Sequence, residues 1–558
     1  MRHRSVIGSF AGQYQAQRHQ AKVGCTRSED AHALVKWGRA GLRDRRFEQA
    51  PNDFAFWRRA VEKIAVKQIE LHRMGTFAMR PLLLCALLAA TLGAAPSPDF
   101  LHLLDRMRAA VGPVWSTHFV SISRLNLEGQ TTVVSSESDG LPFVVRRCEG
   151  ELCEGTYFDG MRLYGVSMND TALPRSADPE PYLRSLRMVA SLTFLAPGFA
   201  AHGGRLIDGG PLTFEGHRYR TLFVTDAHAI PIRLYVDPSD ALVHVVRDLG
   251  GDDTFEYRDY RHVDGFTVPF EIRHNGTVLE RYDDRTPVAS AFHPPRGPVP
   301  TFAGQTPQTI ATDPGHVTPV FDCTVADVPV RCLIDTGNSG LSVSSELAAR
   351  LGLSVIGTFR VRGLGDYATQ VVRAGPLRVG NATYPEAYYV VLNDISRYGY
   401  DVVLGADFLG TGGIEIDAAS HTVRLGAPVA AGGFTIPLSF ENFVPVVSVR
   451  LGSVDARLAV DTGDESNINL AYGFYSKHET LFSVTERRLV SGVGGTSVEL
   501  IGDIPQVTIG DYRTGPEKIG ATQTLEGTAF GHLGAAFLRQ FVVQFDYAAG
   551  ELHLTPKP

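Results

Sequence analysis

The feature that most constrains the fold of this chain is an internal repeat in its second half. Four short motifs recur in the same order, each 126 or 129 residues after its first copy. The pairs are Asp335-Thr-Gly337 and Asp461-Thr-Gly463, Gly363-Leu-Gly365 and Gly492-Val-Gly494, Val403-Leu-Gly-Ala-Asp-Phe-Leu409 and His532-Leu-Gly-Ala-Ala-Phe-Leu538, and Ile414-Glu-Ile-Asp417 and Val543-Gln-Phe-Asp546. Ordered matches with a single length change predict a tandem duplication, with copies at 315–427 and 434–556.

The residues in front of the repeat favour a separate, mainly β domain at 99–285. A short amphipathic helix over Phe100–Val111 opens it, because its apolar residues recur at helical spacing. Stretches rich in β-branched and aromatic residues follow and suggest an antiparallel meander. The clearest of these are Thr131–Ser135, Tyr219–Thr225 and Ile232–Val236. Seven prolines between 286 and 314 predict a semi-extended linker before the repeat.

Each copy of the repeat places its Asp-Thr-Gly motif directly after an apolar strand. Cys-Leu-Ile precedes Asp335, and Leu-Ala-Val precedes Asp461. A carboxylate at the end of a buried strand, followed by a glycine turn, is directed into a cleft. One such motif is a weak signal, because aspartates are common where a strand enters a turn. Two copies, each followed by the same elements, indicate one site built from both.

With these elements in order, residues 315–556 resemble the retropepsin-like and pepsin-like aspartic peptidases. The resemblance implies two β-barrel lobes that form a bilobal fold, with Asp335 and Asp461 as the catalytic dyad. It also implies supporting roles for residues that match the family's motifs. These are the loop residues Thr336, Gly337, Asn338, Thr462, Gly463 and Asp464, the flap residues Gly363, Gly365, Tyr367, Gly492 and Gly494, and the hydrophobic-Gly residues Leu404, Gly405, Leu533 and Gly534.

The family's mechanism is consistent with the chemistry of two aspartates. Two carboxylates in a small site cannot both ionise cheaply, so we expect the dyad to share a proton and to titrate as a pair. The ionised member takes a proton from a water that attacks the peptide carbonyl, and the protonated member hydrogen-bonds the oxyanion. The implied substrate is a peptide or protein, with no cofactor and no metal. Thr336 and Thr462 would hydrogen-bond across the lobe interface, and Tyr367 would contact substrate or be an exposed loop tyrosine.

Several residues depart from the family's pattern. Asn338 and Asp464 stand where Ser, Thr or Ala is usual, and the Asp464 side chain can donate a hydrogen bond only when it is protonated. A third acid beside the dyad should raise the pKa of an aspartate, which indicates either an acidic pH optimum or a second copy that only binds. His532 replaces an apolar residue, either as a titrating neighbour of the dyad or, as we expect, as a histidine at the rim of the site. Asp407 is replaced by Ala536 in the second copy.

The N-terminal part differs in charge from the rest of the chain. Residues 1–95 carry 16 basic and 7 acidic side chains, whereas the remaining residues carry 37 basic and 53 acidic ones. Met79-Arg80 and the apolar stretch that follows are typical of a signal peptide at 79–95, too short to span a bilayer comfortably. We therefore predict a periplasmic or secreted protein whose translation starts at Met79 or Met74. Residues 1–78 are then a non-native or disordered extension.

The cysteines are compatible with export. Four of the six follow the predicted signal peptide, as the pairs Cys148/Cys153 and Cys323/Cys332. Four cysteines allow three connectivities, and we favour the local one, because close pairs bridge hairpins in oxidising compartments. The spacings match no familiar zinc site.

Other interpretations of the chain stay open. The layout of residues 99–285 is similar to the half-barrel domains of bacterial outer-membrane lipoprotein carriers, which implies contact with a lipid or the envelope. An accessory β domain without a ligand is the alternative. The whole chain could also be a non-catalytic periplasmic binding or lipid-handling protein. The two copies pair within a monomer or between chains of a homodimer, and their short connector favours the monomer. The acidic body gives no support for a nucleic-acid partner.

Overall fold

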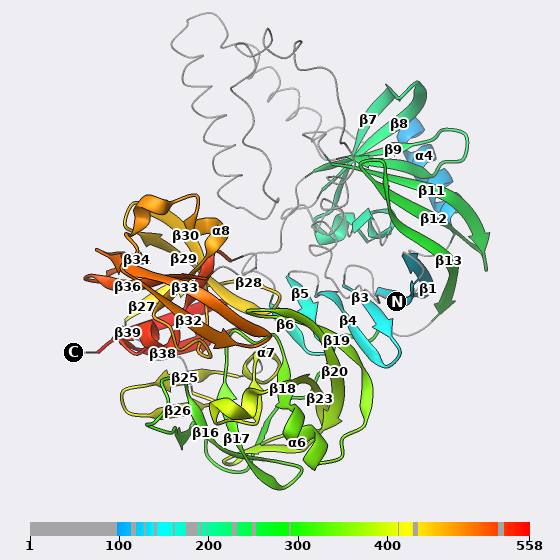
Figure 1. Cartoon of the computed structure of the whole chain (residues 1–558). Helices are drawn as coiled ribbons and strands as arrows, with labels where there is room; N and C mark the ends of the chain where they lie inside the picture. Colours follow the sequence, from blue (N-terminus) through cyan, green and yellow to red (C-terminus); the bar gives the residue numbers. More distant parts are fainter. Residues whose placement is uncertain are drawn as a thin grey trace, which may run out of the picture. The chain divides into compact units, whose positions relative to one another are not determined.

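The structure is a computed structural model that describes residues 97–557, with the exception of 113–118, 128–129, 139–141, 160–161, 175–187, 190–191, 197, 226–230, 248–252, 290–291, 411, 428–432 and 523–528 (Figure 1). The predicted extension at 1–78 and signal peptide at 79–95 lie outside the described residues. No helix in the described part of the chain is long and apolar enough to cross a membrane. The prediction of a mainly β fold is confirmed.

A helix precedes the first sheet. The predicted helix lies within α4 (Pro98–Val111), where Leu104, Met107 and Val111 are buried. These residues recur at intervals of three and four, so their side chains share one face of the helix. Two short 3₁₀ turns, η2 (Thr193–Leu195) and η3 (Ala200–His202), follow later in the same region.

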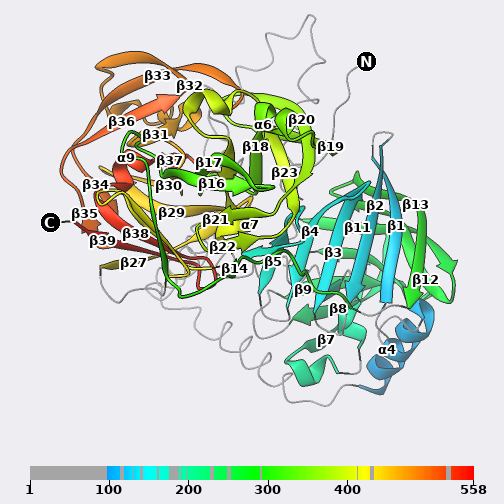
Figure 2. The same cartoon turned by 90° about the horizontal axis from the view of Figure 1, so that it is seen from below.

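The front half of the chain forms one antiparallel half-barrel sheet of 13 strands, and Figure 2 shows β1, β2, β3 and β13 side by side. Two meanders, β1 to β6 and β7 to β13, join where β1 pairs with β13, with Phe119 opposite Ala289. The three strand-like stretches predicted from the sequence lie in β2, β8 and β9. The strands are β1 (Phe119–Leu127), β2 (Gln130–Ser138), β3 (Phe143–Glu149), β4 (Leu152–Phe158), β5 (Leu163–Val166), β6 (Ala172–Pro174), β7 (Arg205–Phe214), β8 (His217–Thr225), β9 (Ile232–Val236), β10 (Val243–Arg247), β11 (Thr254–Val263), β12 (Phe266–His274) and β13 (Thr277–Ala289).

The proline-rich segment 286–314 is more ordered than a free linker. Its first residues belong to β13, and two short strands follow, β14 (Thr301–Phe302) and β15 (Gln308–Ala311). These strands pair with β22 and β26, which lie after the segment. Both lie at the edge of their sheets. Neither β14 nor β15 contains a proline, so the prolines of the segment remove no N–H group from these two strands.

The first lobe is a ten-stranded sheet in the order β14-β22-β21-β16-β17-β24-β18-β23-β20-β19. It is mixed, because β24 runs parallel to β17 and β23 runs parallel to β18. Ser344 is the N-cap of helix α6 (Ser345–Arg350), and its side chain accepts a hydrogen bond from the Leu347 N–H. The remaining elements are β16 (Val320–Val325), β17 (Val328–Ile334), β18 (Leu341–Ser344), β19 (Val355–Arg362), β20 (Asp366–Ala374), β21 (Leu377–Val379), β22 (Ala382–Tyr384), β23 (Ala387–Leu392), η4 (Ile395–Tyr398), β24 (Val402–Leu404) and α7 (Ala406–Leu409).

The second lobe repeats these pairings strand for strand. The order β35-β34-β29-β30-β37-β31-β36-β33-β32 corresponds to β22-β21-β16-β17-β24-β18-β23-β20-β19, and the parallel pairs again fall at the same two places. A short extra strand, β28, pairs with β29. The elements are β28 (Ser439–Glu441), β29 (Val444–Leu451), β30 (Val454–Val460), β31 (Ile468–Ala471), α8 (Tyr472–Tyr475), η5 (Glu479–Leu481), β32 (Glu486–Gly492), β33 (Gly495–Ile504), β34 (Val507–Ile509), β35 (Tyr512–Arg513), β36 (Glu517–Thr522), β37 (Gly531–Leu533) and α9 (Ala535–Leu538).

A six-stranded antiparallel sheet joins the two lobes. It contains β25 and β26 from the first lobe and β38 and β39 from the second, and β25 pairs directly with β38. Its buried side chains belong to the same hydrophobic core as those of both lobes. The two lobes therefore share one core. The strands are β25 (Ile414–Asp417), β26 (Thr422–Leu425), β27 (Phe434–Pro437), β38 (Phe541–Asp546) and β39 (Glu551–Pro556).

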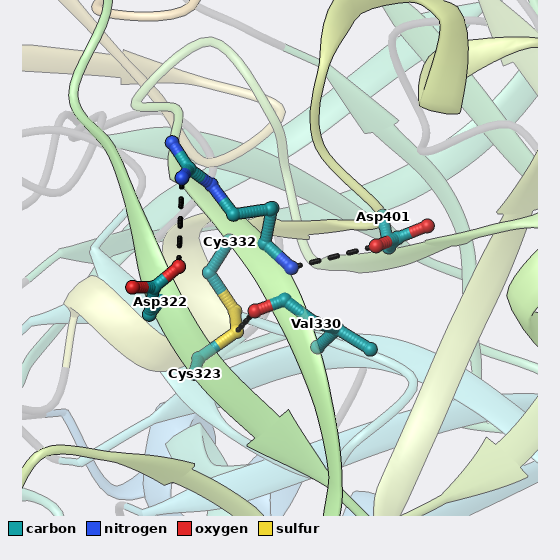
Figure 3. The surroundings of a disulfide bond; sticks show 6 residues. Asp322, Cys323, Val330, Cys332 and Asp401 are labelled. Carbon is teal, nitrogen blue, oxygen red and sulfur yellow. Dashed lines mark hydrogen bonds and ion pairs between the residues drawn. A yellow bond between two sulfur atoms is a disulfide. The ribbon is translucent and has the colours of Figure 1, made fainter. Parts of the chain in front are cut away.

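Both predicted disulfides are present. Cys148–Cys153 links β3 to β4, and Cys323–Cys332 links β16 to β17. Figure 3 shows the second bond between its two strands, beside the Asp322 carboxylate that pairs with Arg331 at 3.5 Å. Both sulfurs of this bond lie in the buried core of the first lobe, because Cys323 and Cys332 are buried.

We expect Phe545→Ala to destabilise the protein strongly. Phe545 lies in the joining sheet with 1% of its surface exposed, and truncation of a buried phenylalanine lowers the free energy of unfolding by about 3–5 kcal/mol. Leu489→Ala is the matched control, because that side chain is 74% exposed and its loss should cost well under 1 kcal/mol. Denaturant unfolding of the full chain measures both, and equal losses would contradict the shared core.

Candidate active site

The two Asp-Thr-Gly loops are held by the hydrophobic-Gly strands. Asp335 follows β17, and its N–H donates to the Leu404 carbonyl of the parallel strand β24 at 3.0 Å. Asp461 follows β30, and its N–H donates to the Leu533 carbonyl of β37, also at 3.0 Å. Each aspartate is thus attached to a buried strand, so its carboxylate is positioned by the core of its lobe rather than by a free loop.

The loop glycines place the two carboxylates together. The Gly337 N–H donates to Asp335 Oδ1 at 2.8 Å, and the Gly463 N–H donates to Asp461 Oδ1 at 2.9 Å. A Cβ atom at Gly337 would lie 2.5 Å from the Asp461 carboxylate, and a Cβ at Gly463 would overlap the Asp335 carboxylate in the same way. Any larger residue at either position would displace the opposite aspartate. The structure therefore brings together Asp335, Asp461, Gly337 and Gly463 at one point.

The threonines of the two loops bond across the lobe interface. Thr336 Oγ1 donates to the Val460 carbonyl at 2.6 Å, and Thr462 Oγ1 donates to the Ile334 carbonyl at 2.9 Å. In return, each hydroxyl oxygen accepts a hydrogen bond from the other threonine's backbone N–H at 3.1 Å. Both threonines are buried. Four bonds therefore fix the separation of the two loops.

The environment of the two carboxyls raises their pKa values. Burial and then the charge of Asp461 hold the pKa of Asp335 well above its usual range, and a hydrogen bond between the two carboxyls acts in the same direction. Burial also raises the pKa of Asp461, although the His532 charge opposes this. Two like charges in so small a site favour a shared proton.

His532 lies against the dyad, so the alternative of a titrating neighbour describes it better than that of an isolated rim histidine, although its side chain is 27% exposed. Its Nδ1 is 3.2 Å from Asp461 Oδ2 and 3.3 Å from Asp464 Oδ2. Burial alone would lower the pKa of His532, but the hydrogen bond with Asp464 and the charges of Asp461, Asp464 and Asp335 together raise it to about 9. His532 is therefore an imidazolium at neutral pH.

Neither the Asp464 side chain nor the Asn338 side chain donates a hydrogen bond to the dyad. Burial disfavours the Asp464 charge, but the hydrogen bond and the charge of His532 outweigh burial and lower the pKa of Asp464. It is the backbone N–H of Asp464 that donates to Asp461 Oδ1, at 3.0 Å. The Asn338 side chain donates to Ser342 instead, at 3.1 Å. The predicted effect of a third acid remains, because the charge of Asp464 acts to raise the pKa of Asp461.

The two glycine-bearing hairpins meet at their tips. Gly363 and Gly365 lie at the turn between β19 and β20, and Gly492 and Gly494 lie at the turn between β32 and β33. The Gly365 N–H donates to the Val493 carbonyl at 3.4 Å. A Cβ at Gly363 would lie 2.5 Å from the same carbonyl oxygen, and a Cβ at Gly365 would overlap Gly494. Glycine is required at these turns because backbone meets backbone.

Tyr367 is part of a packed cluster. It lies in β20 opposite Val361 and packs with Val361 and Val493 in a small apolar cluster of the first lobe. It is partly buried, so the alternative of an exposed loop tyrosine is wrong. Through Val493 this cluster contacts the tip of the second hairpin, which links the two hairpins by side chains as well as by backbone.

Asp407 has a partner that the sequence did not indicate. It is fully buried, and the Asn169 side chain of the turn between β5 and β6 donates to its Oδ2 at 2.7 Å. Burial raises the pKa of Asp407 to about 6, and the hydrogen bond from Asn169 opposes this rise. Ala536 occupies the corresponding place in the second lobe, so this polar connection exists in the first lobe only. The sequence did not indicate this bond, because it joins residues that are 238 apart.

Two groups of side chains bring metal-ligand atoms within 4.8 Å of one another. They are Asp237, Asp240 and His244, and Asp461, Asp464 and His532. In each group the imidazole already pairs with a carboxylate. His244 lies 2.8 Å from Asp240, and His532 lies 3.3 Å from Asp464. None of the six residues has a buried polar atom without a hydrogen-bond partner. We therefore assign both groups to hydrogen bonding and ion pairing.

Comparison with known proteins agrees with the first half of this site. Residues 321–408 match a family described as aspartyl protease. The match runs from β16 to α7 and includes the first Asp-Thr-Gly loop, the first hairpin and Leu404-Gly405. No curated protein matches the chain. The match supports the aspartic peptidase superfamily and an aspartyl-protease-like hydrolase activity.

The cross-lobe threonine bonds can be tested with near-isosteric variants. In Thr462→Val the shape is kept, but the Ile334 carbonyl and the Thr336 N–H lose their partner, and a buried unpaired group costs about 1–3 kcal/mol. Thr462→Ser keeps the hydroxyl and should retain most of the stability. Denaturant unfolding measures the difference. If Ser and Val destabilise equally, the hydroxyl does not carry the interaction.

Proposed function

We propose that the protein is an exported aspartic endopeptidase in which Asp335 and Asp461 activate a water for hydrolysis of a peptide bond. The observation that carries the proposal is the convergence of two partly buried carboxyls, each against the glycine of the opposite loop and each with a raised pKa. The aspartyl protease match over the first loop supports it. The binding-only alternative rested on the acid at Asp464 and on the carrier-like front domain. The ion pair with His532 gives Asp464 a partner and so speaks against the first of these two reasons only.

The proposed mechanism uses the asymmetry of a shared proton. The ionised carboxylate removes a proton from water, and the resulting nucleophile attacks the carbonyl carbon of the scissile bond. The protonated carboxyl donates a hydrogen bond to the oxygen that becomes negative. The amide nitrogen then accepts a proton as the C–N bond breaks, and the dyad returns to one proton. The Gly337 and Gly463 N–H groups hold the carboxylates in place throughout.

The hairpin tips supply a cover for the substrate. They contact each other through backbone atoms, one long hydrogen bond of 3.4 Å and the apolar contacts of Val493, so only these contacts must be broken to separate them. A peptide enters when the tips part, and closure excludes water from the site, which strengthens the electrostatic interactions within it. The substrate is therefore a segment that can lie extended between two hairpins.

We further propose that the two lobes arose by tandem duplication and that they pair within one chain. The identical series of strand pairings and the shared six-stranded sheet support this. The threonine bonds already join the lobes of a single chain. A monomer therefore contains a complete site.

We also propose that the front half-barrel is similar to the domains of lipoprotein carriers. Its support is a continuous antiparallel sheet with one amphipathic helix. Under this proposal the domain contacts a lipid or the cell envelope and keeps the peptidase near its substrate.

Substitution of either aspartate should abolish peptide cleavage. Asp335→Asn and Asp461→Asn are nearly isosteric and remove the acid–base function, so we expect a loss of at least about a thousandfold in kcat. Asp322→Asn is the control, because its carboxylate is exposed on the same lobe and pairs only at 3.5 Å. A peptide-library digest with each folded variant measures the effect. Full activity in either dyad variant would refute a shared dyad.

The export proposal predicts the N-terminus of the native protein. Removal of a signal peptide at 79–95 leaves a mature chain that starts near residue 96 with both disulfides formed, because an oxidising compartment favours them. Mass spectrometry of the protein isolated from its source, with and without reduction, measures both. Peptides from residues 14–58 or free thiols at Cys323 and Cys332 would count against export.

A further inference from the structure

The second lobe places a charged pair beside the dyad that the first lobe lacks. His532 lies in β37 opposite Ala459 of β30 and Asn469 of β31. Val403 lies at the same register position in β24, opposite Leu333 of β17 and Ser342 of β18. The matching residue after the glycine is Asp464 in the second lobe and Asn338 in the first. One lobe therefore presents an imidazole and a carboxylate where the other presents two uncharged side chains.

The geometry ties the imidazole to one aspartate of the dyad. His532 Nδ1 lies 3.2 Å from Asp461 Oδ2 and 3.3 Å from Asp464 Oδ2, so a single N–H is shared by two carboxylates. Asp464 is fixed in turn by the Ser466 N–H, which donates to its Oδ1 at 2.8 Å. In the described part of the first lobe no such cation lies against Asp335: Val403 is buried in an apolar cluster, and the Asn338 side chain donates to Ser342.

Resting on the proposed function, we propose that His532 and Asp464 are positioning residues that fix where the dyad holds its proton. Asp461 stays ionised against the imidazolium, and Asp335 carries the shared proton. Asp461 is then the base that accepts a proton from water, and Asp335 is the acid that donates to the oxyanion. Asp464 partly neutralises the imidazolium. The cation therefore decides which aspartate holds the proton without lowering the pKa of the dyad as far as an unpaired positive charge would.

The other ionisable groups around the site do not supply this orientation. The charged groups that act on His532 are Asp335, Asp461 and Asp464. Tyr400 lies near Asp335, Glu465 and Asp461, and burial and these charges raise its pKa, so it stays neutral. Burial and the charge of Asp335 do the same to the pKa of Tyr547. His532 is the one cation that the described residues place against the dyad.

Three variants separate this role from a merely structural one. His532→Val introduces the residue found in the first lobe and removes the cation. The dyad then takes up its second proton more readily, so the fall of kcat/KM at acidic pH (the acid limb of the pH profile) moves to higher pH by about one unit. Asp464→Asn removes the opposing anion and moves the same limb to lower pH. The double variant Asp464→Asn/His532→Val reproduces the uncharged pair of the first lobe and should place the limb between those of the single variants.

The measurements are pH profiles of kcat/KM for a peptide substrate and an NMR titration of the histidine side chains in the full chain. We expect opposite shifts in the two single variants and titration of His532 near pH 9, which falls by about one unit or more in Asp464→Asn. Shifts in the same direction, or titration of His532 near its ordinary value of about 6.5, would overturn the inference. If the native protein cleaves no peptide, the proposed function fails, and the titration still decides whether the charged pair exists.

Discussion

The site depends on the reciprocal hydrogen bonds between Thr336 and Thr462. Each hydroxyl donates to a carbonyl of the opposite lobe and accepts from the opposite threonine's N–H. Removal of either hydroxyl leaves buried backbone groups without partners, so the two loops can occupy only this arrangement at low cost. The aspartates stand next to these threonines in the chain, and their separation is fixed by the same bonds. A site that must hold two carboxyls within reach of one proton therefore begins with two buried hydroxyls.

Close packing around this point explains the glycines. Gly337 and Gly463 face the carboxylate of the opposite lobe, and Gly363 and Gly365 face the backbone of the opposite hairpin. In each case a Cβ would occupy the place of an atom from the other lobe. These four glycines are thus contacts between lobes, and space requires them, because none of the four has a positive φ. The joining sheet, in which β25 pairs with β38, provides the wider support that lets such close approaches persist.

Two lobes with the same strand pairings need not make identical contributions. The first lobe uses Asp407, its hydrogen bond from Asn169 and an apolar Val403. The second uses Ala536 and the ion pair of His532 with Asp464. Two lobes with the same pairings supply a similar pair of carboxyls, whereas the proposed hydrolysis needs one acid and one base. A charge difference between the lobes is a physical means of separating these roles, because a cation near one carboxyl favours its ionised form.

Much of this structure follows from patterns that are local in the sequence. The ordered repeat, the apolar run before each aspartate and the alternation of β-branched residues indicate a mainly β chain with two similar lobes, and the short cysteine spacings indicate both disulfides. These features can be predicted from the sequence because strand propensity, turn chemistry and short-range pairing depend on residues that are close together in the chain. The tertiary structure alone decided what depends on distant contacts. His532 and Asp464 are 68 residues apart, and Asn169 and Asp407 are 238 apart, so no spacing rule relates them. Their charges and hydrogen bonds affect the site only after folding has placed them next to each other away from water. There an unpaired charge costs free energy, and a paired charge shifts the pKa of the neighbouring carboxyl.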